Sequence, residues 1–569
     1  MKILFQKIVF LVIFSCFALT IKGQDLKSKI DQVNEKVYIS TNNQTVLTGE
    51  SLRYTFFNLT ENFERYSSIS KIGYIELVSP SGELLKKQVI NLENGLGSGS
   101  IYIPTNTLTG NYKLLGYTRW MLNRPISYSF QANIYIINPF QTPKQALISK
   151  EKDSLNPIKV QSKPVSSQFL FAKLSKETYT KREKIQIDLS ALEEANLSVS
   201  VKKLDNLDIT NNMNPIHFTE QNFPKTTNNS TTILPELRGQ IIAGRISGDL
   251  VSNKFVALSI PGGKNSQTKI VSTNNKGEFL FNLAPFPASK KAYIEVLEEN
   301  RNVYRISLDS AEINYKKLDF ENTPLLHSYM KSDIEQRSIA LQIQNAYFDD
   351  KKDSILANPD TKIFYEPLKK VYKLDDYKRF PTIAETIIEI ANEIYFTQKN
   401  DTYKIYLRDR ENFTTTEVYG SSLVLFNGTI VQNLNRLFEL PAKNIERIEF
   451  VNKGYVFGPR IFNGVVNFIN EDYDYELETD KDYRVKANLN RPDAIRLPNE
   501  PNYQEAVKLN KIPDYRYQLY WKPALQMEKE TKNLSFFTSD VSGVFEIKIE
   551  GFTKSGKPVL IRKYFEVTN

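Results

Sequence analysis

Short runs of apolar and β-branched residues, separated by turn residues, dominate the first part of the chain and limit what it can fold into. The seven runs lie at 37–40, 52–58, 72–78, 85–92, 100–103, 112–118 and 134–137. Turn sequences separate them, notably Pro80-Ser81-Gly82 and Thr109-Gly110-Asn111. Many short strands with regular turn signals are typical of an antiparallel β-sandwich. The pattern predicts a first sandwich over residues 24–140.

A second set of strands begins at Phe169 and repeats part of the first set. The matching triplets are Thr45, Glu50, Leu52 and Thr178, Glu183, Ile185. This set stops after about three strands, too few to close a sandwich or to cover their edges. Residues 511–569 contain further strand-like runs. We therefore predict one discontinuous sandwich built from 166–207 with 511–569; two independent small β-domains are the alternative.

The residues between these two segments contain at least two further modules. Residues 236–310 hold apolar runs, and Asn275-Lys276-Gly277 between two of them predicts a hairpin. Residues 311–365 form a predicted helical connector, and Ser332–Glu335 and Thr382–Glu385 are candidate capping boxes at the start of two helices. We assign 141–165 and 476–510 to linkers.

Residues 366–475 mix strands and helices, which predicts a small α+β domain. The predicted elements are strands at 403–408, 422–426, 445–451 and 461–469, a helix at 433–438 and a loop at 454–458. Glycines at 428, 454, 458 and 464 suit turns or positions of close backbone approach.

The first 23 residues have the layout of a secretory signal peptide. Lys2 and Lys7 precede the apolar run 8–19, and small and polar residues follow. The alternative is lipidation at Cys16, the only cysteine. A chain exported without Cys16 has neither disulfides nor thiol chemistry. We expect a periplasmic protein at the inner face of an outer membrane.

Composition argues against several classes of function. The formal net charge is +9, but basic and acidic residues alternate along the chain, so the basic stripe of a nucleic-acid-binding protein is absent. The only histidines, His217 and His327, lie in dissimilar contexts, which gives little material for a zinc site or a Ser-His-Asp triad. We expect a non-enzymatic protein without cofactor or metal.

Two local sequences resemble ligand-binding sites, but each has a simpler structural interpretation. The run 95–99 is rich in glycine, but no helix or GK[ST] sequence follows it, so we predict a hairpin turn and not a phosphate loop. The acidic stretch 471–478 places carboxylates on alternate positions. A solvated domain boundary is the simpler interpretation, and calcium coordination is the alternative.

Three resemblances to known families sharpen the domain assignments. The words IELVSPSGELL, NGLGSGSIYIP and GNYKLLGYTRWM resemble the MG2 domain of bacterial macroglobulin-like proteins. Residues 236–310 resemble a carboxypeptidase regulatory-like sandwich, which is an accessory fold and not the peptidase.

The third resemblance is to the plug domain of TonB-dependent outer-membrane transporters. It rests on Asn427-Gly428, the strand 445–449, Gly458 and Asn463-Gly464-Val465-Val466. Such plugs normally fill a barrel of 22 strands of about ten residues each, which residues 471–569 cannot supply. The chain also departs from the family in Phe457-Gly458-Pro459, where plugs have Tyr-Gly, and in lacking an obvious TonB box.

Together these features predict a mainly β, multidomain protein of macroglobulin/Ig-like sandwiches plus a small α+β plug-like domain, similar to macroglobulin-plus-plug proteins of Bacteroidota. The resemblance implies that the plug-like domain docks on a separate outer-membrane β-barrel and gates it; the type 9 secretion translocon and starch-utilisation-type transporters are candidate pores. The expected partner contacts are Asn427, Gly428, Tyr455, Phe457, Gly458, Arg460 and Phe462. The alternative is a macroglobulin-like scaffold, periplasmic or at the surface, that binds peptides or proteins by β-augmentation. A third hypothesis is an unrecognised hydrolase that uses carboxylates.

Overall fold

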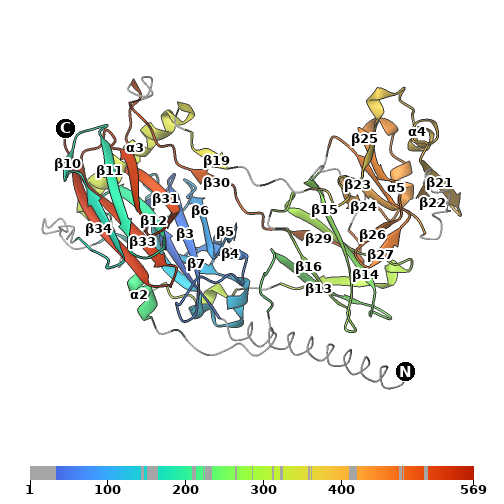
Figure 1. Ribbon diagram of the computed structural model, residues 1–569, viewed down its shortest axis with the longest axis horizontal. Helices are drawn as coiled ribbons and strands as arrows, with labels where there is room; N and C mark the ends of the chain where they lie inside the picture. Colours follow the sequence, from blue (N-terminus) through green and yellow to red (C-terminus); the bar gives the residue numbers. More distant parts are fainter. Residues whose placement is uncertain are drawn as a thin grey trace, which may run out of the picture. The chain divides into compact units, whose positions relative to one another are not determined.

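The computed structural model describes most of the chain after the first 33 residues (Figure 1). The described residues are 34–142, 147–149, 164–207, 213–221, 223, 233–262, 265–284, 286–310, 313–320, 325–350, 352–356, 359, 362–408, 420–472, 477, 480–504 and 511–569. The predicted signal peptide, with Cys16, lies outside them. Two compact units are present: residues 1–237, 313–356 and 493–569 form the first, and residues 238–312 and 357–492 form the second. The predicted class, mainly β and multidomain, is confirmed by the sheets described below.

The first sandwich of the first unit has a three-stranded sheet and a five-stranded sheet. The smaller sheet has the order β1 (Glu35–Thr41), β3 (Ser51–Thr60), β6 (Leu96–Tyr102). The larger has the order β2 (Thr45–Leu47), β8 (Phe130–Ile137), β7 (Gly110–Tyr117), β4 (Ile72–Val78), β5 (Leu84–Asn91). All seven predicted runs are strands, and β2, parallel to β8, is the one that the sequence analysis missed.

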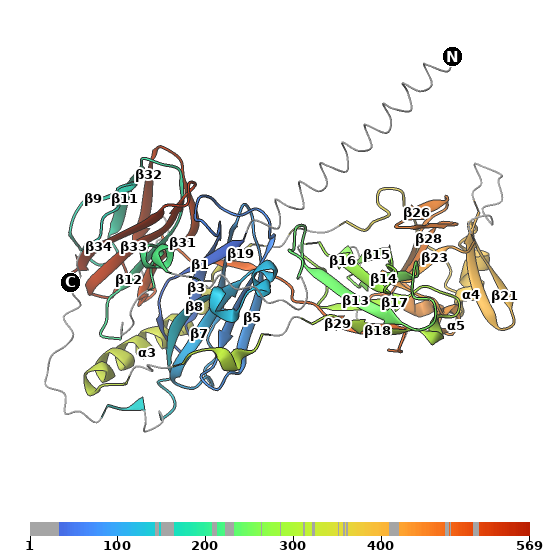
Figure 2. The same cartoon turned by 90° about the horizontal axis from the view of Figure 1, so that it is seen from below.

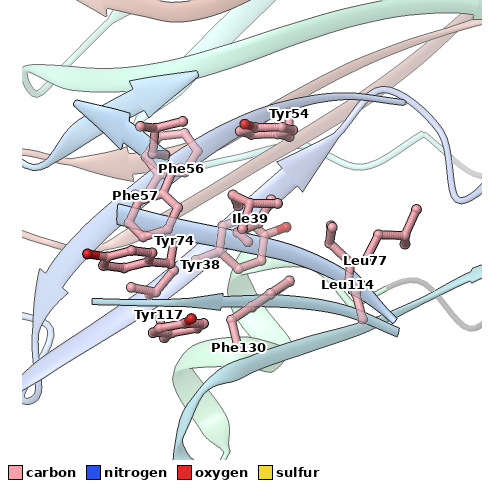
Figure 3. Close-up of a cluster of buried hydrophobic side chains, with 14 of the residues drawn as sticks. Tyr38, Ile39, Tyr54, Phe56, Phe57, Tyr74, Leu77, Leu114, Tyr117 and Phe130 are labelled. Atoms are coloured by element: carbon pink, nitrogen blue, oxygen red, sulfur yellow. The ribbon is translucent and has the colours of Figure 1, made fainter. Parts of the chain in front are cut away.

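The core of this sandwich is aromatic (Figure 3). Tyr38 from β1 meets Phe130 from β8 edge to face, with ring centroids 5.6 Å apart, and it lies 6.1 Å from the ring of Phe57 on β3. Edge-to-face pairs of this kind contribute about 0.5–1.5 kcal/mol each beyond the area that they bury. The two sheets are therefore joined by directional ring contacts as well as by aliphatic packing.

The predicted hairpin turn in the glycine run lies one residue earlier than expected. Asn94 and Gly95 form the turn with φ of 50° and 80°, the left-handed conformation that a tight hairpin requires. Residues 96–99 already belong to β6. A Cβ on Gly99 would lie 2.3 Å from the Tyr54 hydroxyl, so glycine is required there by a close approach and not by a turn.

The second sandwich joins two segments that are far apart in the sequence. Its smaller sheet has the order β9 (Leu170–Leu174), β11 (Lys184–Ala191), β32 (Thr531–Phe537). Its larger sheet has the order β10 (Thr178–Tyr179), β34 (Pro558–Val567), β33 (Gly543–Thr553), β12 (Ala195–Lys203), β31 (Gln518–Met527). In Figure 2 the strands from the end of the chain lie among those of 166–207.

The two sandwiches have the same strand order, and this locates the insertion. In the first sandwich, β4 and β5 pair as a hairpin across residues 79–83. In the second, the equivalent neighbours β12 and β31 also pair, but residues 204–517 lie between them. The whole insertion therefore occupies the place of one short turn.

The described α-helices of the first unit belong to the insertion. Helix α2 spans Pro215–Glu220 and α3 spans Lys331–Ala346. The predicted capping box at Ser332–Glu335 is wrong, because the 3₁₀ turn Ser328–Met330 runs directly into α3 and makes Met330 the N-cap, without a side-chain hydrogen bond. The short strands β19 (Ser354–Leu356) and β30 (Ile495–Leu497) pair with each other in this unit.

The second unit begins with a third sandwich. Its sheets have the orders β16 (Glu278–Asn282), β13 (Ile241–Ser247), β18 (Arg305–Leu308) and β15 (Gln267–Ser272), β14 (Phe255–Ile260), β17 (Lys291–Val296), β29 (Arg484–Asn488). Strand β29 follows the 366–475 module in the sequence. The segment 476–510, predicted as a linker, thus supplies β29 to this sandwich and β30 to the first unit.

The 366–475 module is a five-stranded sheet with helices and two hairpins. The sheet has the order β20 (Lys370–Lys373), β25 (Arg447–Val451), β28 (Val465–Ile469), β23 (Leu423–Phe426), β24 (Thr429–Ile430). The helices are α4 (Ile383–Glu389) and α5 (Leu434–Phe438), and the hairpins are β21 (Ile394–Lys399) with β22 (Thr402–Leu407) and β26 (Tyr455–Phe457) with β27 (Arg460–Phe462). Thr382 and Glu385 form the predicted capping box of α4.

The predicted strand 461–469 is two strands, and the predicted loop 454–458 contains β26. The break lies at Gly464, whose φ is 136° and whose Cβ, if present, would lie 2.3 Å from the Val451 carbonyl oxygen. The chain turns there from the hairpin into β28, a change of direction that period-2 alternation alone does not reveal.

Candidate functional site

The residues predicted to contact a partner come from two turns of the 366–475 module, and the first is the turn between β23 and β24. Asn427 and Gly428 have φ of 51° and 81°, as a two-residue hairpin requires. The Asn427 side chain donates to the Asp472 carbonyl at 3.0 Å and accepts from the Asn470 amide at 2.9 Å. The Asn427 side chain therefore binds the backbone that follows β28.

Gly428 faces the third sandwich at short range. Its carbonyl accepts a hydrogen bond from the Thr268 hydroxyl at 3.0 Å, and a Cβ would lie 2.2 Å from the Cβ of Ser266. The next residues continue this contact, since the Ile430 amide donates to the Ser259 hydroxyl at 3.2 Å. The first turn is therefore part of the contact between the 366–475 module and the third sandwich, within the second unit.

The second turn is the β26–β27 hairpin, and its inner face is aromatic. The Tyr455 hydroxyl donates to the Phe364 carbonyl at 2.8 Å, and the Phe457 ring stacks on the Phe364 ring with centroids 4.0 Å apart. Burial raises the pKa of Tyr455, so this hydroxyl stays protonated as a donor. At the tip, a Cβ on Gly458 would lie 2.5 Å from the Ile270 carbonyl oxygen of β15.

Arg460 and Phe462 complete that inner face. The Arg460 guanidinium donates to the Leu297 carbonyl at 3.1 Å and lies 5.1 Å from the centre of the Phe255 ring. Phe462 is buried in the hydrophobic cluster that joins the module to the third sandwich. The structure thus places all seven predicted residues in contacts within the second unit; that they contact a separate protein stays a prediction.

The outward face of the same hairpin carries two apolar residues that the sequence analysis did not single out. Val456 and Ile461 pair across β26 and β27, and they are 70% and 48% exposed. Alternation along the strand is the signal that could have found them: if Tyr455 and Phe457 point inward, Val456 points outward. This pair is the accessible apolar part of the hairpin.

The strand 445–449, which carried much of the plug resemblance, supplies an anchor inside the module. Glu449 is buried and accepts hydrogen bonds from the Tyr365 hydroxyl at 2.8 Å and from the Arg447 guanidinium at 3.1 Å. Burial and the Glu449 charge raise the pKa of Tyr365, which keeps that donor protonated. Asn467 donates to the Tyr365 hydroxyl at 2.8 Å. These motif residues hold the sheet together and are not offered to a ligand.

The two histidines lie in separate local environments of the first unit. His217 lies in α2 beside Asn214, with 3.0 Å between Nδ1 and the amide nitrogen, and His327 stacks on Tyr329. Within the described ranges, no group of three His, Cys, Asp or Glu side chains could hold a metal ion. Of the acidic stretch 471–478, only Glu471, Asp472 and Leu477 are described, so the calcium alternative lies largely outside the described residues.

Among the helices that the structure describes, none combines the length and apolarity needed to cross a membrane.

Comparison with known proteins gives structural neighbours only. No protein-family model matches the chain, and no curated protein matches it. Among solved structures, the chain is similar to Salmonella alpha-2-macroglobulin reacted with methylamine (8% identity over 94% of this chain and 23% of that one, TM-score 0.16). It is also similar to Escherichia coli alpha-2-macroglobulin activated by porcine elastase (8%, 94% and 44%, TM-score 0.25). A third neighbour is the tetra-tandem repeat in the extending region of a large adhesion protein (7%, 94% and 99%, TM-score 0.13).

The chain spans less than half the length of either macroglobulin. At these TM-scores the likenesses carry no argument about corresponding sites, and the fold class rests on the sheets themselves.

Proposed function

We propose that this protein is a non-enzymatic, β-rich periplasmic scaffold that docks through its 366–475 module on a separate outer-membrane β-barrel and closes it. The macroglobulin-like assignment of the two sandwiches in the first unit and the plug-like assignment of the module belong to this proposal, as does the type 9 secretion translocon as a candidate pore. The observation that supports it best is the outward apolar pair Val456 and Ile461.

An exposed cross-strand apolar pair is a feature that binding surfaces use, because the two side chains leave water together on association. The hairpin that carries the pair is fixed from behind by the Tyr455 hydrogen bond and the Phe457–Phe364 stack. A hairpin fixed in this way loses little conformational entropy on binding. The inward residues thus support the contact by holding it in place.

The test uses the full chain with both outward residues changed, V456D with I461D. A C-terminally tagged protein is purified from detergent-solubilised membranes of the native host, and the co-purifying proteins are identified. V544D is the matched control, since Val544 is an exposed strand valine of the first unit. We expect one stoichiometric outer-membrane barrel with the wild type and with V544D, and its loss with V456D/I461D.

Closure is tested separately by placing the purified barrel in liposomes and measuring efflux of a small solute. Added wild-type protein is expected to slow the efflux, and V456D/I461D is expected not to. If no barrel co-purifies, or if the double variant retains it, docking through this hairpin is wrong. If the barrel binds but efflux is unchanged, the protein is a docking scaffold and not a gate.

The second candidate function, peptide or protein capture by β-augmentation, is favoured by a different feature. Strand β5 is an edge strand, and the exposed residues Leu84 and Leu85 on it line a groove of about 350 Å³ together with Leu108. An edge strand next to apolar pockets is the geometry that adds an extended peptide. L84D with L108D should then abolish several weak interactions while leaving the barrel interaction intact, measured in the same pull-down.

A further inference from the structure

The first unit contains a cavity of about 280 Å³ at the point where the insertion interrupts the second sandwich. Its walls come from the 42–53 region of the first sandwich, the end of β12 with Lys202 and Lys203, helix α3 with Phe348 and Asp353 beyond it, and residues 498–503 and 512–521. Helix α3 and residues 498–503 belong to the insertion, so the cavity combines the insertion with both sandwiches. The cavity has the size of a small ligand.

Two arginines of the wall are already neutralised by carboxylates. Arg337 of α3 donates two hydrogen bonds of 2.7 Å to Glu50 and one of 3.0 Å to Asp205. Arg516 is held by Asp514, with 2.8 Å between the guanidinium and a carboxylate oxygen. Because their carboxylate partners already balance their charge, these two arginines stabilise the wall and do not need an anionic ligand.

Arg53 and Lys203 are less well satisfied. A single long contact of 3.4 Å joins Arg53 to Asp353, and the buried Arg53 Nε has no hydrogen-bond partner among the described residues. The Lys203 ammonium lies 4.8 Å above the Tyr517 ring, and within the described part of the chain it forms no ion pair with a carboxylate. Burial lowers the pKa of both groups, and the nearby carboxylates only partly oppose it: Asp353 for Arg53, and Asp205 and Asp333 for Lys203.

Aromatic side chains form much of the remaining surface. The cavity is lined by Tyr503, Tyr517 and Trp521, and by Phe348 from the 3₁₀ turn that follows α3. Rings of this kind contribute flat apolar area against which a planar or aliphatic group packs. The lining therefore combines an anion-seeking part with an apolar part.

We propose that this cavity binds a small carboxylate with an apolar body. The carboxylate lies between Arg53 and Lys203, and the body lies against Tyr517 and Phe348. The free carboxyl end of a peptide and a small aromatic acid share this chemistry. Binding in this cavity does not depend on docking through the 366–475 module.

Titration calorimetry on the full chain tests the proposal with three probes: N-acetyl-glycyl-phenylalanine, the same compound as its C-terminal amide, and 3-phenylpropionate. We expect saturable binding of at least one of the two acids, with at least tenfold weaker binding of the amide. R53Q and K203Q are each expected to weaken binding of that acid about tenfold. K173Q, which removes one exposed positive charge from β9, is the control and is expected to bind like the wild type.

The outcomes separate the two ligand sources. Binding of the peptide acid alone identifies a peptide end, and equal binding of 3-phenylpropionate identifies a small aromatic acid. Equal affinity for acid and amide, unchanged affinity in both R53Q and K203Q, or no binding of either acid overturns the proposal. Circular dichroism of each variant shows that it is folded, and the two variants on different strands guard against a local defect in one.

Discussion

The two sandwiches of the first unit share one strand order and, in their smaller sheets, one register, yet they place different side chains at equivalent positions. Leu52 faces Ile101 across β3 and β6, and Ile185 faces Phe536 across β11 and β32. The backbone arrangement therefore fixes which positions lie opposite each other, while different side chains can fill those positions.

A glutamate illustrates this. Glu50 accepts from the Leu47 amide at 2.9 Å, and Glu183 accepts from the Thr180 amide at 2.8 Å, at the same spacing of three residues. In the second sandwich the other partner is Lys176, whose side chain is 59% exposed. In the first it is Arg337, which is 6% exposed and comes from the insertion. In the first sandwich, the glutamate that bonds this amide also holds α3 through Arg337.

At two further pairs of equivalent positions, the first sandwich has polar or small residues and the second has apolar ones. Tyr54 lies opposite Gly99, whereas the equivalent pair in the second sandwich is Ile187 and Leu534. At the start of β1, Lys36 pairs with Leu59, and the equivalent backbone position before β9 is Phe169. The first sandwich thus uses a tyrosine over a glycine and a buried lysine where the second uses apolar residues.

The largest expected loss of stability tests the difference between Glu50 and Glu183. R337M leaves Glu50 and Asp205 without their buried partner, and removing one member of a buried charge network costs about 3–5 kcal/mol of unfolding free energy. K176M, at the equivalent glutamate, is expected to change stability little because Lys176 is exposed. Urea unfolding followed by tryptophan fluorescence measures both. Equal losses in the two variants would contradict the assignment of Arg337 as an anchor.

The next largest expected loss of stability comes from crowding between Tyr54 and Gly99. G99A places a Cβ against the Tyr54 hydroxyl and is expected to cost about 1–3 kcal/mol, as overpacking does. The double variant Y54I/G99A imitates the aliphatic side of the second sandwich and should recover part of that loss relative to the two single changes. A double-mutant cycle in urea gives the coupling; strictly additive effects would show that the two residues do not interact.

The third effect is a change in pH dependence at Lys36. Its ammonium lies 3.1 Å from the centres of the Tyr128 and Phe223 rings, and burial lowers its pKa from 10.5 to about 6, against the opposing charge of Glu61 and with that of Arg124. Between these pH values the unfolded chain binds a proton that the folded chain does not, so stability rises with pH across this window.

K36M should flatten that rise, measured as unfolding free energy from pH 6 to 10. K173M, at an exposed lysine of β9, should leave the slope unchanged. A wild-type slope retained in K36M would mean that the two rings stabilise the ammonium as a cation.

The smallest effect is the loss of the Glu183 charge. Hydrogen bonds from Lys176 and from the Thr180 amide hold the pKa of Glu183 below its usual value of 4.5. The folded pKa is depressed, so this contribution is present above the unfolded pKa and is lost as pH falls through the folded one. E183Q should remove a small acid-dependent part of stability below pH 4.5. An acid profile identical to that of the wild type would assign that part to other carboxylates.

Local signals in the sequence located most strands and several turns. Alternation predicted the strands of the first sandwich except β2, and Thr382–Glu385 is the predicted capping box. The predicted hairpin at Asn275-Lys276-Gly277 is wrong, because this turn joins β15 to β16, which lie in different sheets and pair there with β14 and β13. The failures occurred where one segment runs into another. Ser332 is not a cap because a 3₁₀ turn continues into α3, and Gly464 divides what alternation presented as one strand.

The candidate contact residues show the limit more clearly. The glycines and aromatics of 427–428 and 455–462 were recognisable as special from their types, because tight turns and close approaches demand glycine. Which molecule they approach was not recognisable. The structure places them against the third sandwich and leaves Val456 and Ile461 outward.

Local patterns were enough to establish the fold class, most strands, and the shared spacing of Thr45, Glu50, Leu52 with Thr178, Glu183, Ile185, because these depend on the alternation and turn chemistry of neighbouring residues. Long-range packing established that Glu50 contacts Arg337, that the insertion replaces a turn, and that a cavity forms where it begins. The reason is physical: contacts between residues hundreds of positions apart are selected by how whole faces pack, and a local pattern carries no information on which face will be covered.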